Sequence, residues 1–193
     1  MRRHRGEDDR AGQGSGSLPR SERNRRRAIG RWLGPVQPAR SSARHRRLQS
    51  ISLDGISGWS EPEFVEDLPE PICFGSLARL SEQTGGGKNC LLFSIVSGTA
   101  IGRKKNNYDE QGFQREDLAV FLSYDEGRTW PVKKTIQAGP CGCGYSDLAV
   151  LADGTILCAC GSGPSFGRGA GISLARFDLE WLTDGKESFH PHR

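Results

Sequence analysis

Short apolar runs separated by turn residues fill the chain from Leu48 onward. The runs are rich in β-branched and aromatic residues, and a helical period occurs only in a short piece near Leu179–Leu182. We expect strands at Phe74–Leu80, Cys90–Val96, Leu118–Ser123, Ser146–Ala152, Ile156–Cys160 and Ile172–Phe177. Asp153-Gly154 joins two of these runs and is a hairpin signal of the primed-turn kind. The chain is therefore predicted to be all-β, and a propeller, a sandwich and a barrel all fit this pattern.

The stretch "LSYDEGRTWP" at residues 122–131 predicts a tight turn that satisfies its own hydrogen bonds. A carboxylate after a strand accepts bonds from the next backbone N–H groups, and a following glycine supplies the positive φ that such a turn needs. The indole then fills apolar space beneath the turn, Thr-Trp re-enters a strand, and Pro131 interrupts the ladder. The residues with these structural roles are Ser123, Asp125, Gly127, Thr129 and Trp130.

A degenerate copy of this turn lies about 70 residues upstream, in "SLDGISGW". It keeps Ser52, Asp54 and Trp59 at the same offsets. Repeated hairpins are typical of a propeller or an array. At roughly 40–50 residues per four-stranded blade, the part of the chain with strand pattern makes about three blades, fewer than the four or more that close a ring.

Charge divides the chain into two parts. Residues 1–47 hold 14 Arg, no Lys and four acidic residues, a net charge of +10, whereas residues 48–193 carry a net charge of −6. We interpret residues 1–39 as a disordered basic segment, 40–185 as the folded region and 186–193 as a tail. A basic arm for nucleic acid is the alternative for the first segment, but we favour a solvated tail. Arginine without lysine is also what translation of a GC-rich gene in the wrong frame yields.

Targeting segments, cysteines and acidic runs give little further information about function. No apolar run resembles a signal peptide or a membrane span, so the sequence leaves the compartment open. The six cysteines include two C-x-C pairs, for which we favour neither a metal site nor disulfides. Cys158 and Cys160 lie in an apolar run, where free cysteine behaves as a small hydrophobe. An acidic run around Pro62 and Pro69 is expected to be a solvated loop; its residues are Glu61, Glu63, Glu66 and Glu70.

The order of the remaining motifs resembles the C-terminal half of exo-α-sialidases, also called neuraminidases. The matching stretches are "RRLQSISLDG", "LPEPICFGSLARL", "CLLFS", "REDLAVFLSYDEGRTWP", "GYSDLAVLADGTIL" and "ISLARFDLEWLTDGK", which together cover roughly Arg40 to Leu182. In that family the turn pattern is the Asp-box, or BNR repeat, of a six-bladed β-propeller. The resemblance implies that this chain forms about three blades of such a propeller.

The family hydrolyses terminal α-linked sialic acid with retention, without metal or cofactor, and is often secreted or periplasmic. Three arginines grip the substrate carboxylate, and Arg115 matches the third and Arg40 the second. Tyr145 matches the tyrosine nucleophile, an exception among retaining glycosidases. Glu22 has the spacing of the partner base that activates this tyrosine. The resemblance thus implies sialylated glycans as partners, and neither a membrane nor nucleic acid.

The sequence also departs from the family pattern. No residue matches the first arginine or the acid/base aspartate, and the surroundings of Glu22 are not strand-like, which fits an out-of-frame reading before Arg40. The glutamate that supports the first arginine is replaced by Gly161. We therefore expect this chain to be a truncated sialidase that is weakly active or inactive. The alternative is a non-catalytic Asp-box propeller fragment that binds carbohydrate or protein.

Overall fold

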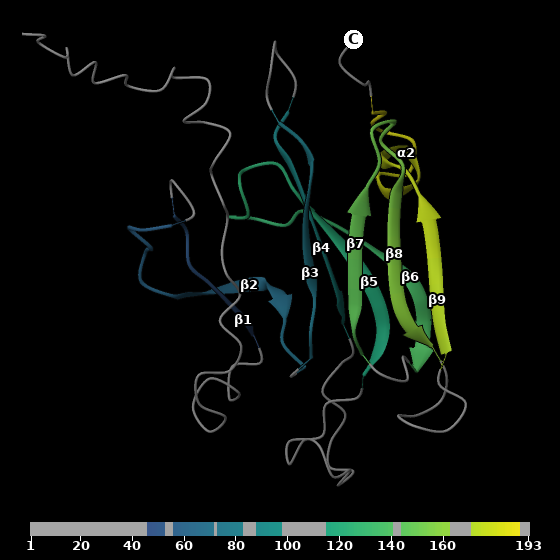
Figure 1. The fold of residues 1–193 in the computed structure, drawn as a ribbon, viewed down its shortest axis with the longest axis horizontal. Helices are drawn as coiled ribbons and strands as arrows, with labels where there is room; N and C mark the ends of the chain where they lie inside the picture. Colours follow the sequence, from purple (N-terminus) through teal and green to yellow (C-terminus); the bar gives the residue numbers. More distant parts are fainter. Residues whose placement is uncertain are drawn as a thin grey trace, which may run out of the picture.

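The computed structural model describes residues 46–52, 56–71, 73–82, 88–97, 115–140, 144–162 and 171–189. These residues form three antiparallel sheets and one short helix (Figure 1). The first sheet pairs β1 (Arg46–Gln49) with β2 (Glu63–Pro69). The second has the order β3-β4-β5-β6, formed by Ser76–Ser81, Cys90–Val96, Glu116–Ser123 and Val132–Pro140. The third has the order β7-β8-β9, formed by Ser146–Val150, Ile156–Ser162 and Gly171–Phe177, and α2 (Leu179–Leu182) follows it.

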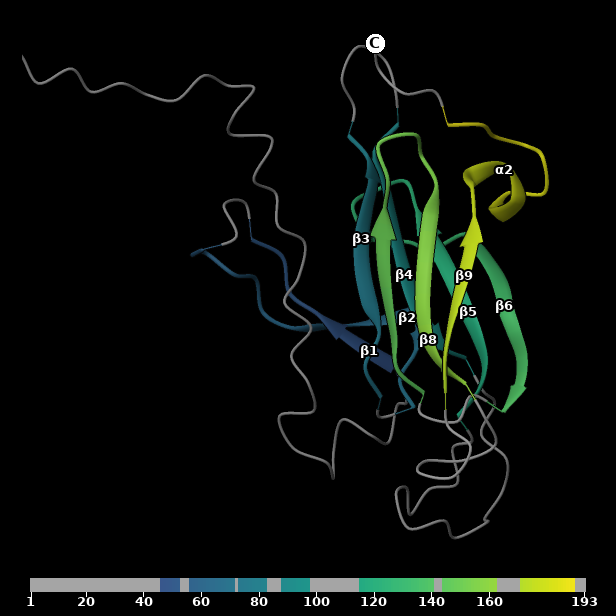
Figure 2. The same cartoon turned by 45° about the vertical axis from the view of Figure 1, so that its right-hand side comes forward.

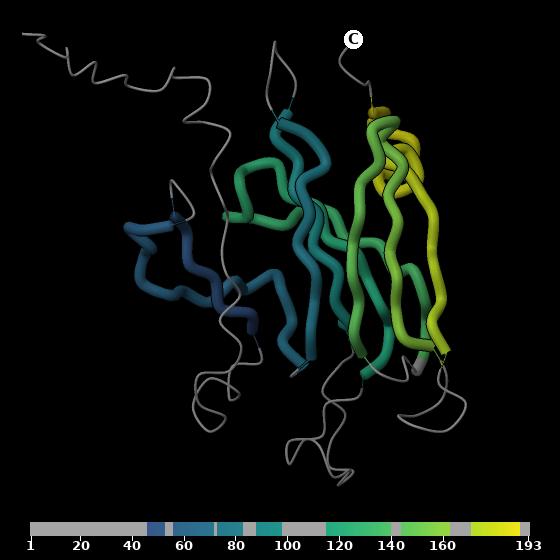
Figure 3. Tube along the Cα trace, in the orientation of Figure 1, coloured from purple at the N-terminus to yellow at the C-terminus, as the bar shows by residue number. Residues whose placement is uncertain are grey.

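The four-stranded sheet lies between the other two sheets. Every residue of β4 is buried, which agrees with a sequence that is apolar except for Ser94 and with a strand covered on both faces. Successive side chains of a strand point to opposite faces. Phe93 meets Arg47 of β1, while Ser94 bonds Ser146 of β7. Figure 2 shows the third sheet lying against the second, and the tube in Figure 3 follows the chain through the sheets in sequence order.

The structure confirms the strands expected from apolar runs, with small shifts at their ends. Three further strands were not predicted: Arg46–Gln49, Glu63–Pro69 and Val132–Pro140. The prediction of a solvated acidic loop is therefore wrong, because most of it is β2. Val65 and Leu68 of that strand are buried in the core, whereas Glu66 is exposed.

The two predicted hairpins differ in detail from expectation. At the β7–β8 connection only Gly154 has positive φ, 85°, and its N–H bonds the Leu151 carbonyl. Asp153 does not have the positive φ that a primed turn requires, so that prediction is wrong. After the other turn, β6 begins at Val132, so Thr129 and Trp130 precede the strand instead of re-entering it.

The Ser123–Trp130 turn has the internal hydrogen bonds expected of it. Asp125 accepts bonds from Ser123 Oγ at 2.8 Å, from Thr129 N at 2.9 Å and from Thr129 Oγ1 at 2.7 Å. Gly127 has φ of 81° and donates to Ser123 Oγ. Trp130 is buried beneath the turn, with its ring 6.0 Å from that of Phe93. In the upstream copy Ser52 is also fully buried and donates to the Ser57 carbonyl, whereas Asp54 lies outside the described residues.

Replacing Asp125 with alanine is expected to lower the free energy of unfolding by about 1–2 kcal/mol at pH 7, because the turn loses three hydrogen bonds. Burial acts to raise the pKa of Asp125, but bonds from Thr129, Ser123 and the Arg128 backbone outweigh it and hold that pKa below its ordinary value. The contribution is therefore present above the unfolded pKa of about 3.9 and is lost as pH falls through the folded pKa.

Urea unfolding at pH 7 and at pH 3 measures this effect. The matched control is Asp153→Ala in the β7–β8 turn, where the carboxylate bonds the N–H of Thr155 and is exposed to solvent. We expect the control to change stability less. An Asp125→Ala variant as stable as the wild type at pH 7 would contradict the structural role of this carboxylate.

The described cysteines are packing residues. Cys158 is fully buried in the core, and burial raises the pKa of its thiol to about 12, so the thiol stays neutral. Cys160 is also buried, on the same face of β8. In the described part of the chain no cluster of three or more His, Cys, Asp or Glu is arranged to hold a metal ion.

The chain after α2 is attached to the sheets. Glu187 forms an ion pair with Lys88 at 2.7 Å, and the ring of Phe189 lies against Gly154. The predicted boundary at residue 186 stays a prediction. Among the described residues, no helix has the length and apolar character to cross a membrane.

Candidate functional site at one end of the sheets

Arg115 and Tyr145 lie together although 30 residues separate them in the sequence. Each immediately precedes a strand, β5 and β7 respectively. The Arg115 guanidinium carbon lies 5.6 Å from the centre of the Tyr145 ring, within range of a cation–π contact. Tyr145 is 40% exposed, so its phenol can be reached from solvent. The structure thus brings together the two described residues that the sequence singled out for chemistry.

Gly144 allows this approach. It has φ of 66°, a left-handed conformation that favours glycine. A Cβ at this position would lie 2.6 Å from Cδ of Arg115, a distance that atoms do not tolerate. The glycine before Tyr145 is therefore needed both for the turn and for the arginine stem that packs across it.

A β-bulge in β5 directly follows Arg115. The pairing of β5 with β6 shifts register between Glu116 and Leu118, and Asp117 in between has φ of 55°. Asp117 Oδ1 accepts a bond from Gly139 N at 2.8 Å, which fixes the bulge. Bulges of this kind redirect neighbouring side chains, and non-glycine residues with positive φ occur often at functional sites. No sequence pattern marks Asp117, because a bulge depends on the partner strand.

Hydrogen bonds to two sheets hold the start of β7. The Tyr145 carbonyl accepts from Gly161 N at 3.2 Å. Next along the chain, Ser146 Oγ and Ser94 Oγ lie 2.8 Å apart. Asp147 Oδ1 accepts from Ser76 Oγ at 2.8 Å, a bond that links β7 to β3. Tyr145 is therefore tied to β8 within its own sheet and, through its neighbours, to β3 and β4.

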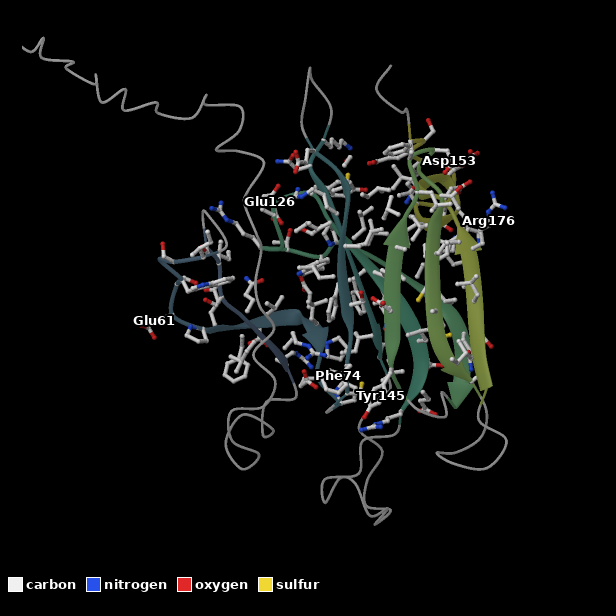
Figure 4. All side chains as sticks on the ribbon, in the orientation of Figure 1. Glu61, Phe74, Glu126, Tyr145, Asp153 and Arg176 are labelled. Carbon is white, nitrogen blue, oxygen red and sulfur yellow. The ribbon has the colours of Figure 1, made fainter. Side chains whose placement is uncertain are left out.

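Phe74 contacts Tyr145 at the same end of the sheets. Its ring centroid lies 5.1 Å from that of Tyr145, with an angle of 64° between the ring planes (Figure 4). The apolar pattern predicts a strand that begins at Phe74, but β3 begins at Ser76. An apolar side chain before a strand is not by itself a signal of a site, so only the tertiary structure shows this contact.

A buried ion pair supports the segment before Phe74. Arg47 is 5% exposed and forms an ion pair with Glu70 at 2.6 Å. Its Nη2 donates to the Cys73 carbonyl at 3.0 Å. Burial raises the pKa of the Cys73 thiol to about 12, so this cysteine is neutral at physiological pH and is not poised as a nucleophile.

The Ser123–Trp130 turn lies far from this site. Arg115 directly precedes β5 and Ser123 is its last residue, so eight steps of about 3.3 Å separate them along the chain. Figure 4 shows Glu126 of the turn well away from Phe74 and Tyr145. Two other candidates for the site, Arg40 and Glu22, lie outside the described residues, so their proposed roles stay predictions.

Comparison with known proteins places the fold in a family. The chain is 31% identical over 148 residues to a sialidase from Micromonospora viridifaciens, a match that covers 75% of this chain and 20% of that protein. The solved structure of the Hadza microbial sialidase Hz136 matches with a TM-score of 0.53 and 24% identity, over 72% of this chain and 24% of the other. A leech intramolecular trans-sialidase in complex with 2,7-anhydro-Neu5Ac matches with a TM-score of 0.51 and 17% identity, over 72% of this chain and 21% of the other. No family model matches the chain.

These results define the class as an all-β chain whose three antiparallel sheets are part of a β-propeller. Within this class, the chain is related to the sialidase family over the region that the matches cover. The chain spans about a fifth of the length of the curated relative.

Proposed function

We propose that Arg115 and Tyr145 are part of a sialidase-type site that cleaves terminal α-linked sialic acid from glycans. The observation that carries this proposal is the contact between the Arg115 guanidinium and the exposed Tyr145 ring at one end of the sheets. The sialidase relative supports the substrate class. The Ser123–Trp130 turn is then an Asp-box on the side of the blade away from the site.

The chemistry follows from the charge of the substrate. Sialic acid carries a carboxylate on its reacting carbon, and a guanidinium fork binds a carboxylate through two parallel hydrogen bonds. In this proposal Arg115 binds that carboxylate together with Arg40. A carboxylate nucleophile would be repelled by the substrate, whereas the phenol of Tyr145 approaches uncharged.

The reaction then proceeds in two displacements. Tyr145 Oη loses its proton to a base and bonds to the anomeric carbon, while the bond from that carbon to the glycosidic oxygen breaks and the leaving oxygen takes up a proton. Water next attacks the anomeric carbon and releases the tyrosine, so two inversions give net retention. A phenol of ordinary pKa near 10 needs a base for the first step, and Glu22 is our candidate.

We further propose that the 193-residue chain alone turns substrate over weakly or not at all. Its sequence has no match for the first of the three arginines or for the acid/base aspartate. A glycoside whose leaving group needs no protonation is therefore the right probe.

A sialosyl fluoride with a second fluorine at C3 tests the nucleophile. Fluoride leaves without acid assistance, and the C3 fluorine destabilises the positively charged transition state, so the covalent intermediate accumulates. We expect mass spectrometry to find the sialosyl adduct on the peptide that contains Tyr145 and not on the one that contains Tyr124. Tyr145→Phe is expected to abolish the adduct and to leave sialoside binding within about twofold, since it removes one hydroxyl.

The alternative function is non-catalytic binding of carbohydrate or protein. The observation that favours it is Gly161, which lies opposite Tyr145 in β8 where the family resemblance implies a glutamate. Sialoside binding without any adduct would support this alternative and contradict a nucleophilic Tyr145. Absence of both binding and adduct would overturn the assignment of a sialic acid site.

A further inference from the structure

Phe74 is exposed in an unusual setting. Its side chain is 70% exposed, yet its ring packs edge-to-face against Tyr145 at 5.1 Å. Single exposed apolar residues are common on protein surfaces, so exposure alone indicates nothing. What distinguishes Phe74 is its position beside the candidate nucleophile and the way its backbone is held.

Buried groups fix the chain on both sides of Phe74. Before it, the Cys73 carbonyl accepts the bond from Arg47, which is itself paired with Glu70. After it, Gly75 packs so closely that a Cβ would lie 2.5 Å from the Ser94 carbonyl oxygen. An apolar ring is thus presented to solvent from a backbone with little freedom, so little ordering entropy is lost when a ligand contacts it.

The ring of Tyr145 has two different neighbours. Arg115 brings a cation to 5.6 Å, and Phe74 brings an apolar aromatic surface to 5.1 Å. A ligand that fits both has a negative group and a surface of C–H bonds. An acidic sugar has both features, because the C–H bonds of a pyranose ring carry slight positive charge and pack on the negative face of an aromatic ring.

We propose that Phe74 forms an aromatic wall of the sugar subsite and contacts the C–H face of the glycan bound beside Tyr145. This inference rests on the proposed sialic acid site and adds a specificity residue to it. Arg115 recognises the carboxylate, whereas Phe74 distinguishes a sugar from a small carboxylate that lacks an extended C–H surface.

Titration of the whole chain with 3′-sialyllactose, followed by NMR, tests the proposal. We expect Phe74→Ala and Phe74→Leu to weaken affinity about three- to tenfold, and Phe74→Tyr to stay within about twofold, because only the last keeps an aromatic face. The matched control is Ile172→Ala, which removes an apolar side chain that is 86% exposed on β9. It should leave affinity unchanged.

The outcomes separate this inference from the proposed function. One outcome is that the wild type binds, that Arg115→Ala weakens binding and that Phe74→Ala binds like the wild type. In that case the assignment of Phe74 as an aromatic wall is wrong, whereas the assignment of the carboxylate site stands. If the wild type does not bind sialyllactose, the sialic acid site is wrong, and with it the sugar partner of Phe74. The melting temperature of Phe74→Ala should match that of the wild type, since the side chain is largely exposed. A lower melting temperature of Phe74→Ala, together with an equal loss of affinity in Phe74→Tyr, would indicate a structural role for Phe74 instead.

Discussion

Replacing Glu70 with alanine is expected to lower the free energy of unfolding by about 3 kcal/mol, because the change leaves the buried Arg47 without its carboxylate. The side chain of Arg47 is 6% exposed and that of Glu70 is 18% exposed, so water cannot replace the lost charge easily. Burial lowers the pKa of Arg47, and Glu70 opposes that shift, which agrees with an ion pair removed from solvent.

Urea unfolding measured by circular dichroism gives the free-energy change. The matched control is Glu66→Ala in β2, four residues before Glu70, which removes an ion pair with Arg46 at 3.6 Å in which the two side chains are 39% and 74% exposed. Exposed pairs contribute about 0–1 kcal/mol, so the control should change little. Equal effects of the two substitutions would show that burial does not decide the strength of the Arg47–Glu70 pair.

A double substitution adds a second test of this pair. Replacing Arg47 and Glu70 together with methionine and leucine removes both charges and keeps most of the buried volume. We expect it to recover part of the stability lost in Glu70→Ala, because the desolvation cost of the unpaired guanidinium disappears. No recovery would mean that the bond from Arg47 to the Cys73 carbonyl carries most of the effect.

Replacing Arg115 with alanine is expected to weaken sialoside binding about 10- to 100-fold, because a bidentate hydrogen bond to a charged group contributes about 1.5–3 kcal/mol. Arg115→Lys should recover only a small part of the affinity, since an ammonium lacks the planar fork that matches a carboxylate. Isothermal titration calorimetry with 3′-sialyllactose measures both variants.

The matched control is Arg176→Ala, which removes an exposed arginine of β9 that Figure 4 shows far from Tyr145. It should leave affinity unchanged. Circular dichroism of Arg115→Ala checks that the fold is retained, because the stem of Arg115 packs on Gly144. Wild-type affinity in a folded Arg115→Ala variant would overturn the assignment of this residue to the carboxylate.

Some of the fold could be predicted because local sequence and tertiary environment agree. The run Cys90–Val96 is apolar except for Ser94, and the strand it forms is buried on both faces. The strand Glu63–Pro69 was missed because four of its seven residues are acidic or proline, and its strand character comes from pairing with β1. Val132–Pro140 was missed for a similar reason, since its lysines favour solvent and its strand character comes from pairing with β5.

By itself, the sequence determined the all-β class, the hydrogen-bonded turn at Ser123–Trp130 and the choice of Arg115 and Tyr145 as candidates. The class and the turn depend on residue types at short spacing, whose local backbone preferences are known. The two candidates come from the resemblance of the ordered motifs to exo-α-sialidases. Only the tertiary structure decided that Phe74 packs on Tyr145, that Asp117 forms a bulge behind Arg115 and that Glu70 pairs with the buried Arg47. Those contacts join residues on or next to different strands, and no local pattern in the sequence specifies which residues of two strands will lie beside each other.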